Sequence, residues 1–334
     1  MDAAVLKLLF QRAKTITGGK LTSFTHVSRT TNTKPTSLTH HFSTGRHMTQ
    51  SPEQQLQSAE REIAELQVAT KDALSHGRVS EALELAQRAR EQTVAYFGPR
   101  HAASASALNN VALVLKASGS TDNLKAALPL LEEAAQMYEE LQGYGKKHAS
   151  TATAYSNLGT LHLTLARNES GLAKVPHIEA GRAYHELALS ARKETLGATH
   201  TMVGVSMYQL ASALRLQRKF KEAESLLHES IALLRSSAGP RNTTTATAIN
   251  NLGFLFKEMK DFARADAAYL EALEIRREKL GPSHPDTITA QNNLAECKRA
   301  AGDEDGAIKI QRDILQVLGV SDDHNEPEDA RKLV

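Results

Sequence analysis

The stretch LGPSHPDTITAQNNLA, from Leu280 to Ala295, decides the fold because it recurs along the chain. One copy, AGPRNTTTATAINNLG, begins at Ala238, 42 residues earlier, and another, LGATHTMVGVSMYQLA, begins at Leu196, a further 42 residues upstream. Two looser copies, FGPRHAASASALNNVA and YGKKHASTATAYSNLG, begin at Phe97 and Tyr144. Self-similarity at a period of this length predicts a solenoid of stacked repeats.

Each repeat is expected to contain two helices, and the first begins at the His-Pro-Asp element. Pro285 suits the first helical position, where its missing N–H would have no partner anyway. Asp286 then lies in the first turn, where the helix dipole favours an anion. His284 falls at the cap, and the equivalent positions of the other copies hold His101, His148, His200 and Asn242. We interpret these histidines as capping or packing residues rather than metal ligands, because equivalent positions on successive repeats do not converge on one ion.

The second helix of each repeat carries small residues at regular intervals, such as Ala265 and Ala272 on either side of Tyr269. Read together with Leu252-Gly253 and Phe256 of the preceding helix, the whole repeat has the order Leu-Gly, Phe, Ala, Tyr, Ala. Small side chains let two antiparallel helices approach closely, and this order matches the tetratricopeptide signature. The fold class expected is all-α, a right-handed α-solenoid of about six helix-turn-helix repeats.

We place the repeat array at residues 51–319 and expect two of its repeats to be lengthened. Five extra residues fall in the turn around residues 118–125, with Pro129 in the first turn of the next helix, because proline is tolerated there. Ten extra residues fall near residues 168–178 and predict a protruding loop. The expected repeats span residues 52–97, 101–143, 148–196, 200–238, 242–280 and 284–318.

The 42-residue repeats with GPxHPDT and NNLA motifs resemble the tetratricopeptide domain of kinesin light chains. The resemblance covers residues 52–318 and is closest over residues 239–319. It implies that the inner, concave helices bind short peptides, with helix asparagines holding the peptide backbone. Members of that family also carry a long heptad segment that binds the motor heavy chain. Between the predicted transit segment and the body of the first repeat only residues 52–66 remain, too few for such a coiled coil, so the resemblance implies the module and not motor binding.

Composition agrees with helix pairs. The 334 residues are 41% hydrophobic but only 4% aromatic, with no Trp, which suits close helical packing better than a sheet. The single cysteine, Cys297, excludes a disulfide framework and a multi-cysteine metal site. No stretch approaches about 18 uninterrupted apolar residues, so no membrane-spanning helix is expected.

The two ends of the chain differ in composition from the repeats. Residues 1–50 hold seven Lys or Arg and a single acid, Asp2, and they begin with an amphipathic segment followed by a Ser/Thr-rich stretch. This pattern is typical of an organelle transit peptide, and it predicts a protein of the mitochondrial matrix or inner membrane. Plastid and cytoplasmic locations are the alternatives, and Met48 could start an untargeted form. Residues 320–334 read as a disordered acidic tail.

No catalytic constellation is found in the sequence. Gly18-Gly19-Lys20 lacks the upstream glycine and the Ser/Thr of a phosphate-binding loop, and neither HExxH nor G-x-S-x-G occurs. We therefore expect no enzyme, no cofactor and no metal. The residues outside 1–50 hold 33 basic and 37 acidic side chains, a balance that does not indicate nucleic-acid binding.

The candidate site is the groove wall formed by the inner helices. In the tetratricopeptide register, groove-facing positions carry an amide or polar residue, and cations recur seven residues later on the same face. A helix interior disfavours asparagine, so its recurrence suggests that the amide serves an extended ligand. The cations would favour an acidic peptide. The alternatives are repeat-to-repeat hydrogen bonds for the asparagines and dipole compensation for the cations. The predicted partner-binding residues are Asn109, Lys116, Tyr208, Arg215, Asn250, Lys257, Asn292 and Arg299.

The function expected is that of a non-catalytic adaptor or assembly factor in mitochondria, binding a partner segment in the concave groove. Respiratory-complex or mitoribosome assembly would suit that address. A cytosolic adaptor of the kinesin light chain type and a structural subunit of a large mitochondrial complex are the alternatives. The sequence does not specify the partner or the oligomeric state.

Overall fold

A computed structural model describes residues 52–319 of the chain. The predicted transit peptide at residues 1–50 and the predicted tail at residues 320–334 lie outside this range. Between residues 52 and 319 there are twelve α-helices, one short 3-10 turn and no strand. The helices form six consecutive antiparallel pairs, so the prediction of an all-α solenoid of about six repeats is confirmed.

In each pair the first helix is the inner one and the second is the outer one. The inner helices are α2 (Pro52–Ser75), α4 (Ala102–Ala117), α6 (Ala149–Asn168), α8 (Thr201–Leu216), α10 (Thr243–Glu258) and α12 (Pro285–Ala300). The outer helices are α3 (Val79–Phe97), α5 (Thr121–Glu140), α7 (Lys174–Leu196), α9 (Phe220–Ser237), α11 (Phe262–Leu280) and α13 (Glu304–Val317). The 3-10 turn η1 (Gly171–Ala173) joins α6 to α7.

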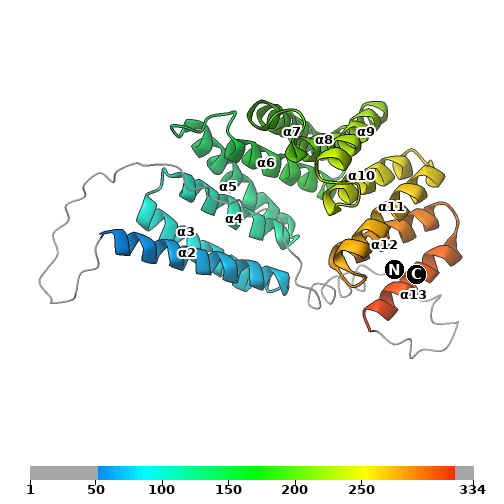
Figure 1. Cartoon of the computed structure of the whole chain (residues 1–334), viewed down its shortest axis with the longest axis horizontal. Coiled ribbons are helices and arrows are strands. Elements are labelled where there is room, and N and C mark those ends of the chain that lie inside the picture. The colour runs from blue at the N-terminus through cyan, green and yellow to red at the C-terminus, as the bar shows by residue number, and fades with distance from the viewer. Residues whose placement is uncertain (1–51, 320–334) are drawn as a thin grey trace, which may run out of the picture.

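The pairs follow an arch, with α2 at one foot, α7 and α8 at the top and α13 at the other foot (Figure 1). Each helix packs mainly against the helix before it and the helix after it. The inner helix α8 also contacts the inner helices α6 and α10 of the neighbouring pairs. Because the inner helices approach one another across the repeats, they line the concave side of the arch.

Side-chain caps start the inner helices where the sequence predicts them. The Nδ1 atom of His284 accepts a hydrogen bond from the backbone N–H of Asp286 at 3.1 Å, and α12 begins at Pro285. His101, His148 and His200 cap α4, α6 and α8 in the same way. Of the two predicted roles, capping or packing, the structure shows capping. Because Nδ1 accepts, the proton of each neutral ring is assigned to Nε2.

The two lengthened repeats differ from expectation. In the second repeat the α4–α5 turn is confined to residues 118–120, and the extra residues lie mainly between α5 and α6, at residues 141–148. Pro129 lies well inside α5, not in its first turn. Its ring is exposed, so the carbonyl that loses its partner can bind water. In the third repeat α6 has 20 residues, whereas α4 and α8 have 16. The expected protruding loop is thus shortened to a few residues around η1. Continuing the helix satisfies more backbone hydrogen bonds than an irregular loop would.

Apart from a small cluster of Ile288 and Ile314, the apolar core consists of two clusters, one between residues 73 and 188 and the other between residues 210 and 297. Alanines and leucines dominate both, as expected for closely packed helix pairs. At the junction Arg192 of α7 is only 3% exposed and donates a hydrogen bond to the Ser206 hydroxyl at 2.7 Å. Close approach needs glycine in both clusters: a Cβ on Gly253 would meet the Tyr269 ring at 2.8 Å, and one on Gly159 would meet His185 at 2.7 Å.

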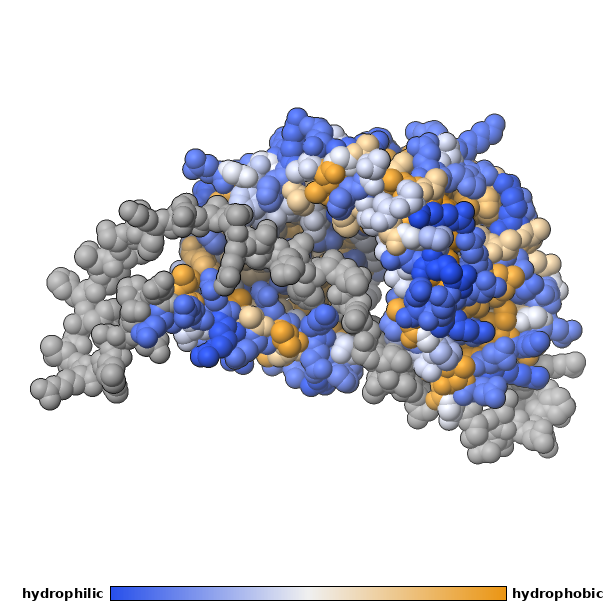
Figure 2. All heavy atoms as spheres, viewed as in Figure 1, coloured by the Kyte–Doolittle hydropathy of each residue, from blue (hydrophilic) through white to orange (hydrophobic). Residues whose placement is uncertain are grey.

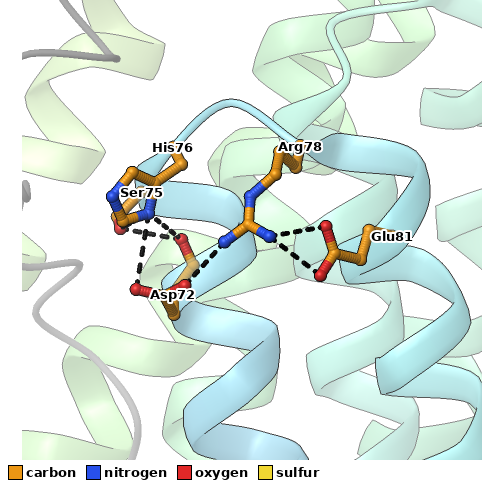
Figure 3. A network of polar contacts seen from close by, with 5 residues as sticks. All are labelled: Asp72, Ser75, His76, Arg78 and Glu81. Carbon is orange, nitrogen blue, oxygen red and sulfur yellow. Dashed lines mark hydrogen bonds and ion pairs between the residues drawn. The ribbon is translucent and has the colours of Figure 1, made fainter.

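Short turns and a polar surface complete the solenoid. At the turn between α2 and α3, Arg78 contacts Asp72 at 2.6 Å and Glu81 at 2.8 Å, as Figure 3 shows. The surface seen in Figure 2 is mostly hydrophilic, with apolar residues in smaller patches. No helix within residues 52–319 is long and apolar enough to span a bilayer.

Candidate partner-binding groove

The eight predicted groove residues all lie on inner helices, but they are not equally open to solvent. Arg299 is exposed, whereas Asn250 and Arg215 are 6% and 9% exposed. The remaining five are partly buried: Asn109, Lys116, Tyr208, Lys257 and Asn292. The groove wall is therefore closely packed, and their role in partner binding stays a prediction.

The asparagines link successive repeats. The Asn157 side-chain amide donates to Asn109 Oδ1 at 2.7 Å, and the Asn293 amide donates to Asn250 Oδ1 at 3.0 Å. Ser156 donates to Gln209 Oε1 at 2.8 Å across the intervening step. These bonds are the repeat-to-repeat function that the sequence left open as an alternative. Since each amide still has donor hydrogens, the bonds do not prevent contact with a ligand.

The cations in the second half of the groove pair with glutamates of the chain itself. Arg215 pairs with Glu258 of the next inner helix. Lys257 pairs with Glu296 at 3.0 Å. The third pair joins Arg299 to Glu304 of the same repeat at 3.2 Å. Each positive charge therefore has an internal counter-charge, which weakens its attraction for an external anion.

The first half of the groove differs, because its cations have no counter-charge. The side chains of Lys116 on α4 and Arg167 on α6 form no ion pair or hydrogen bond with any residue between 52 and 319. Burial lowers the pKa of Lys116, and repulsion by Arg167 lowers it further. Partial desolvation also lowers the pKa of Arg167, although this residue is exposed at the end of α6. Both groups remain cations at neutral pH, since neither ordinary pKa is near 7.

Arg167 lies within electrostatic range of a third groove cation. Burial lowers the pKa of Arg215 to about 10, and repulsion by Arg167 contributes to that shift. Lys116, Arg167 and Arg215 come from α4, α6 and α8, three successive inner helices. Charge repulsion thus links two predicted residues with one that the sequence analysis did not select.

Arg167 was missed because the repeat register places Leu163 at the cation position of α6. Leu163 is 4% exposed and packs beside Gly181 of α7. Arg167 lies four residues further along, one turn later on the same face. A helix continued through residue 167 would have revealed it. The glutamates that pair with Arg215 and Lys257 were missed as well, because spacings of 43 and 39 residues have no meaning until the helices are stacked.

Other chemistry is not indicated in the part of the chain that the structure describes. Residues 52–319 contain no group of three or more His, Cys, Asp or Glu side chains placed to hold a metal ion. Cys297 is 1% exposed, and burial raises the pKa of its thiol, which disfavours the reactive thiolate.

Comparison with known proteins identifies the repeats. Family models described as tetratricopeptide repeat match residues 203–242 and 244–318. A search of curated protein sequences finds no match. The predicted tetratricopeptide repeats are therefore confirmed over these residues.

Three solved structures illustrate the likeness. BtubC (BKLC) from P. vanneervenii has a TM-score of 0.51 at 21% identity, covering 80% of this chain and 94% of its own. The Cut9–Hcn1 hetero-tetramer of APC/C has a TM-score of 0.53 at 14% identity, covering 84% of this chain and 44% of that chain. A Podosopora anserina protein described as a kinesin light chain with nearly identical TPR-like repeats has a TM-score of 0.45 at 16% identity, covering 62% of this chain and 92% of its own. Likeness at these identities concerns the fold alone.

Proposed function

We propose that this chain, a tetratricopeptide repeat protein, is a non-catalytic adaptor that binds an acidic segment of a partner protein in its concave groove. Stacked helix pairs hold the groove in shape before binding, so the receptor loses little entropy when a partner segment docks. The observation that carries the proposal is the unpaired charge of Lys116 and Arg167. Lys116 is partly buried, and a partly desolvated cation without a counter-charge is costly, so a carboxylate supplied by a partner would offset that cost. Arg167 is exposed and is therefore accessible to the same carboxylate.

The first half of the groove is accordingly the anchoring region of the proposed site. Arg215, Lys257 and Arg299 already have glutamate partners, so a ligand carboxylate would have to displace an internal ion pair there. Lys116 and Arg167 require no such exchange. Charge complementarity of this kind contributes to specificity and association rate more than to bulk affinity.

The test uses a fluorescein-labelled hexaglutamate peptide and fluorescence anisotropy, with hexaglutamine as the uncharged probe. Lys116→Ala combined with Arg167→Ala should weaken hexaglutamate binding about tenfold, which corresponds to ~1.4 kcal/mol. Lys257→Ala combined with Arg299→Ala is the matched control and should change it less than about twofold. Binding should also weaken with salt. Equal binding of both probes, independent of salt, would contradict an acidic partner.

The proposed location is the mitochondrion, where an adaptor of this kind could act in assembly of a respiratory complex or of the mitoribosome. Its support is the basic, acid-poor composition of residues 1–50, which lie outside the described residues. A fluorescent fusion of residues 1–50 should enter mitochondria. Retention of the fusion in the cytosol would contradict the proposed location while leaving the groove proposal intact.

A further inference from the structure

The insertion in the third repeat has a feature that the rest of the solenoid lacks. The Nδ1 atoms of His162 on α6 and His177 on α7 lie 2.9 Å apart, so one ring donates a hydrogen bond to the other. His162 is 7% exposed, and its ring stacks on Tyr184 with an interplanar angle of 13°. His177 lies in the first turn of α7, near the end of the insertion. The bond therefore fastens the end of α6 to the start of α7.

A glutamate supports this fastening from the other side of the His177 ring. Glu169, directly after α6, has a carboxylate oxygen 3.7 Å from His177 Nε2. The same oxygen is buried and has no hydrogen-bond partner among the described residues. An ionised carboxylate beside Nε2 favours a proton on that nitrogen. In the neutral ring, Nδ1 then accepts from the Nδ1–H of His162.

In the sequence, Arg167 lies between His162 and Glu169, the two residues that contact the His177 ring. It precedes Glu169 by two residues and follows His162 by five, and it belongs to the last turn of α6. The last turn of a helix frays most easily, because its carbonyl groups have no intrahelical partners. Asn168 supplies one more tie, donating to the Thr121 hydroxyl of α5 at 3.4 Å. The turn that carries Arg167 is thus held by contacts that exist only because the repeat is lengthened.

We propose that the third-repeat insertion is a specificity element of the groove, in which the His162–His177 hydrogen bond positions Arg167 beside Lys116 for a partner carboxylate. The inference rests on the proposed function and assigns roles to three residues within it. Arg167 contacts the ligand. His162 and His177 are positioning residues, because they act only by holding the turn that presents Arg167. In this arrangement the inserted turn supplies the groove cation that Leu163 does not.

The experiment compares two substitutions at His177 in the full chain. His177→Ala removes the bond to His162. His177→Asn keeps a polar atom close to the place of Nδ1 and is the rescue variant. The first readout is hydrogen exchange of the amides between residues 163 and 174. His177→Ala should speed exchange there about tenfold, because the turn opens locally, and His177→Asn should restore most of the protection.

The second readout is affinity for the labelled hexaglutamate peptide. Arg167→Ala should weaken binding about fivefold and His177→Ala about threefold. His177→Asn and the control Arg235→Ala, which removes an ion-paired cation of the outer helix α9, should remain within about twofold of the natural chain. These results would support the proposal. Faster exchange in His177→Ala with unchanged affinity would overturn the positioning role. Unchanged exchange would overturn the fastening itself.

The same data separate this inference from the proposed function. If Lys116→Ala weakens hexaglutamate binding but Arg167→Ala does not, the groove binds acidic segments and the insertion is not part of the site. If the natural chain does not distinguish hexaglutamate from hexaglutamine, the proposed function fails and the specificity element fails with it.

Discussion

The two halves of the solenoid have the same architecture but differ in whether their groove cations are paired with acidic side chains. From α8 onward, the groove cations Arg215, Lys257 and Arg299 are matched one to one by glutamates. Before α8, Lys116 and Arg167 have no counter-charge in the described chain. The asparagine links are present in both halves. The difference therefore lies in charge and not in the packing of the repeats. The same repeat architecture holds ion-paired cations in one half of the groove wall and unpaired cations in the other.

The two halves also differ in their buried titratable side chains, because the first half contains buried histidines. Burial lowers the pKa of His162 to about 4, with repulsion from His177 as a second cause. His185 is 1% exposed, and burial lowers its pKa to about 3, with Arg192 and Lys116 adding repulsion. The corresponding position in the fifth repeat holds Tyr269, which is neutral at pH 7. The first half therefore contains buried histidines that resist protonation, and the comparison can be tested through pH.

The largest difference is expected on acidification. Each of these histidines has an ordinary pKa near 6.5 when the chain is unfolded, so below that pH the unfolded chain binds more protons than the folded one. The stability that they contribute is complete above about pH 6.5 and is lost as the pH falls towards the folded values near 3 to 4. The helices α4 to α7 should lose protection from hydrogen exchange before α8 to α12, after correction for intrinsic exchange rates.

A control variant separates His185 from general acid effects. His185→Tyr copies the residue found at the equivalent position, Tyr269, and removes the titrating ring. We expect this variant to shift the acid transition of the first half to lower pH. The comparison of the halves would be broken if both halves opened together in the natural chain, or if His185→Tyr left the transition where it was.

A medium effect is expected when the second half is made to resemble the first. Glu258→Gln leaves Arg215 without its counter-charge, and Arg215 is only 9% exposed. This change should destabilise the chain by about 2 kcal/mol in urea unfolding, because a buried guanidinium loses its partner. Glu296→Gln is the control. Its carboxylate is 58% exposed, so the loss should stay below about 1 kcal/mol.

Both substitutions release a groove cation and should therefore increase affinity for the hexaglutamate peptide. If neither substitution increases the affinity, internal ion pairing does not limit peptide binding by the second half. The difference in ion pairing between the halves would then have no consequence for binding.

The smallest effect is expected from the asparagine links, and it should be equal in the two halves. Asn293→Ala and Asn157→Ala each remove one hydrogen bond between repeats, at a cost of about 1 kcal/mol. Urea unfolding measures both changes. A much larger loss in one half would mean that the links, and not the charges, distinguish the two regions.

The sequence predicted the repeats well because their signals are local and repeated. The glycine after each outer helix, the capping histidine and the small residues of the second helix recur in register, and each acts within a few residues of itself. Prediction was weakest at the two insertions. Pro129 was placed in a first turn and lies inside α5. Residues 168–178 were read as a loop, yet α6 and α7 continue through most of them. Where the period is interrupted, register no longer constrains the assignment.

The candidate site divides in the same way. The inner-helix location of all eight predicted residues follows from the repeat period. Whether a cation is free or paired does not, because Glu258 and Glu296 meet their partners only when neighbouring inner helices stack. The closeness of His162 and His177 likewise depends on two helices folding back on each other.

By itself, the sequence determined that this protein is a tandem array of helix pairs with a polar inner face, because helical periodicity and capping depend on residues only a few positions apart in the chain. Only the tertiary structure decided which charges of that face are neutralised, since ion pairing depends on distances of a few ångströms between residues about forty positions apart.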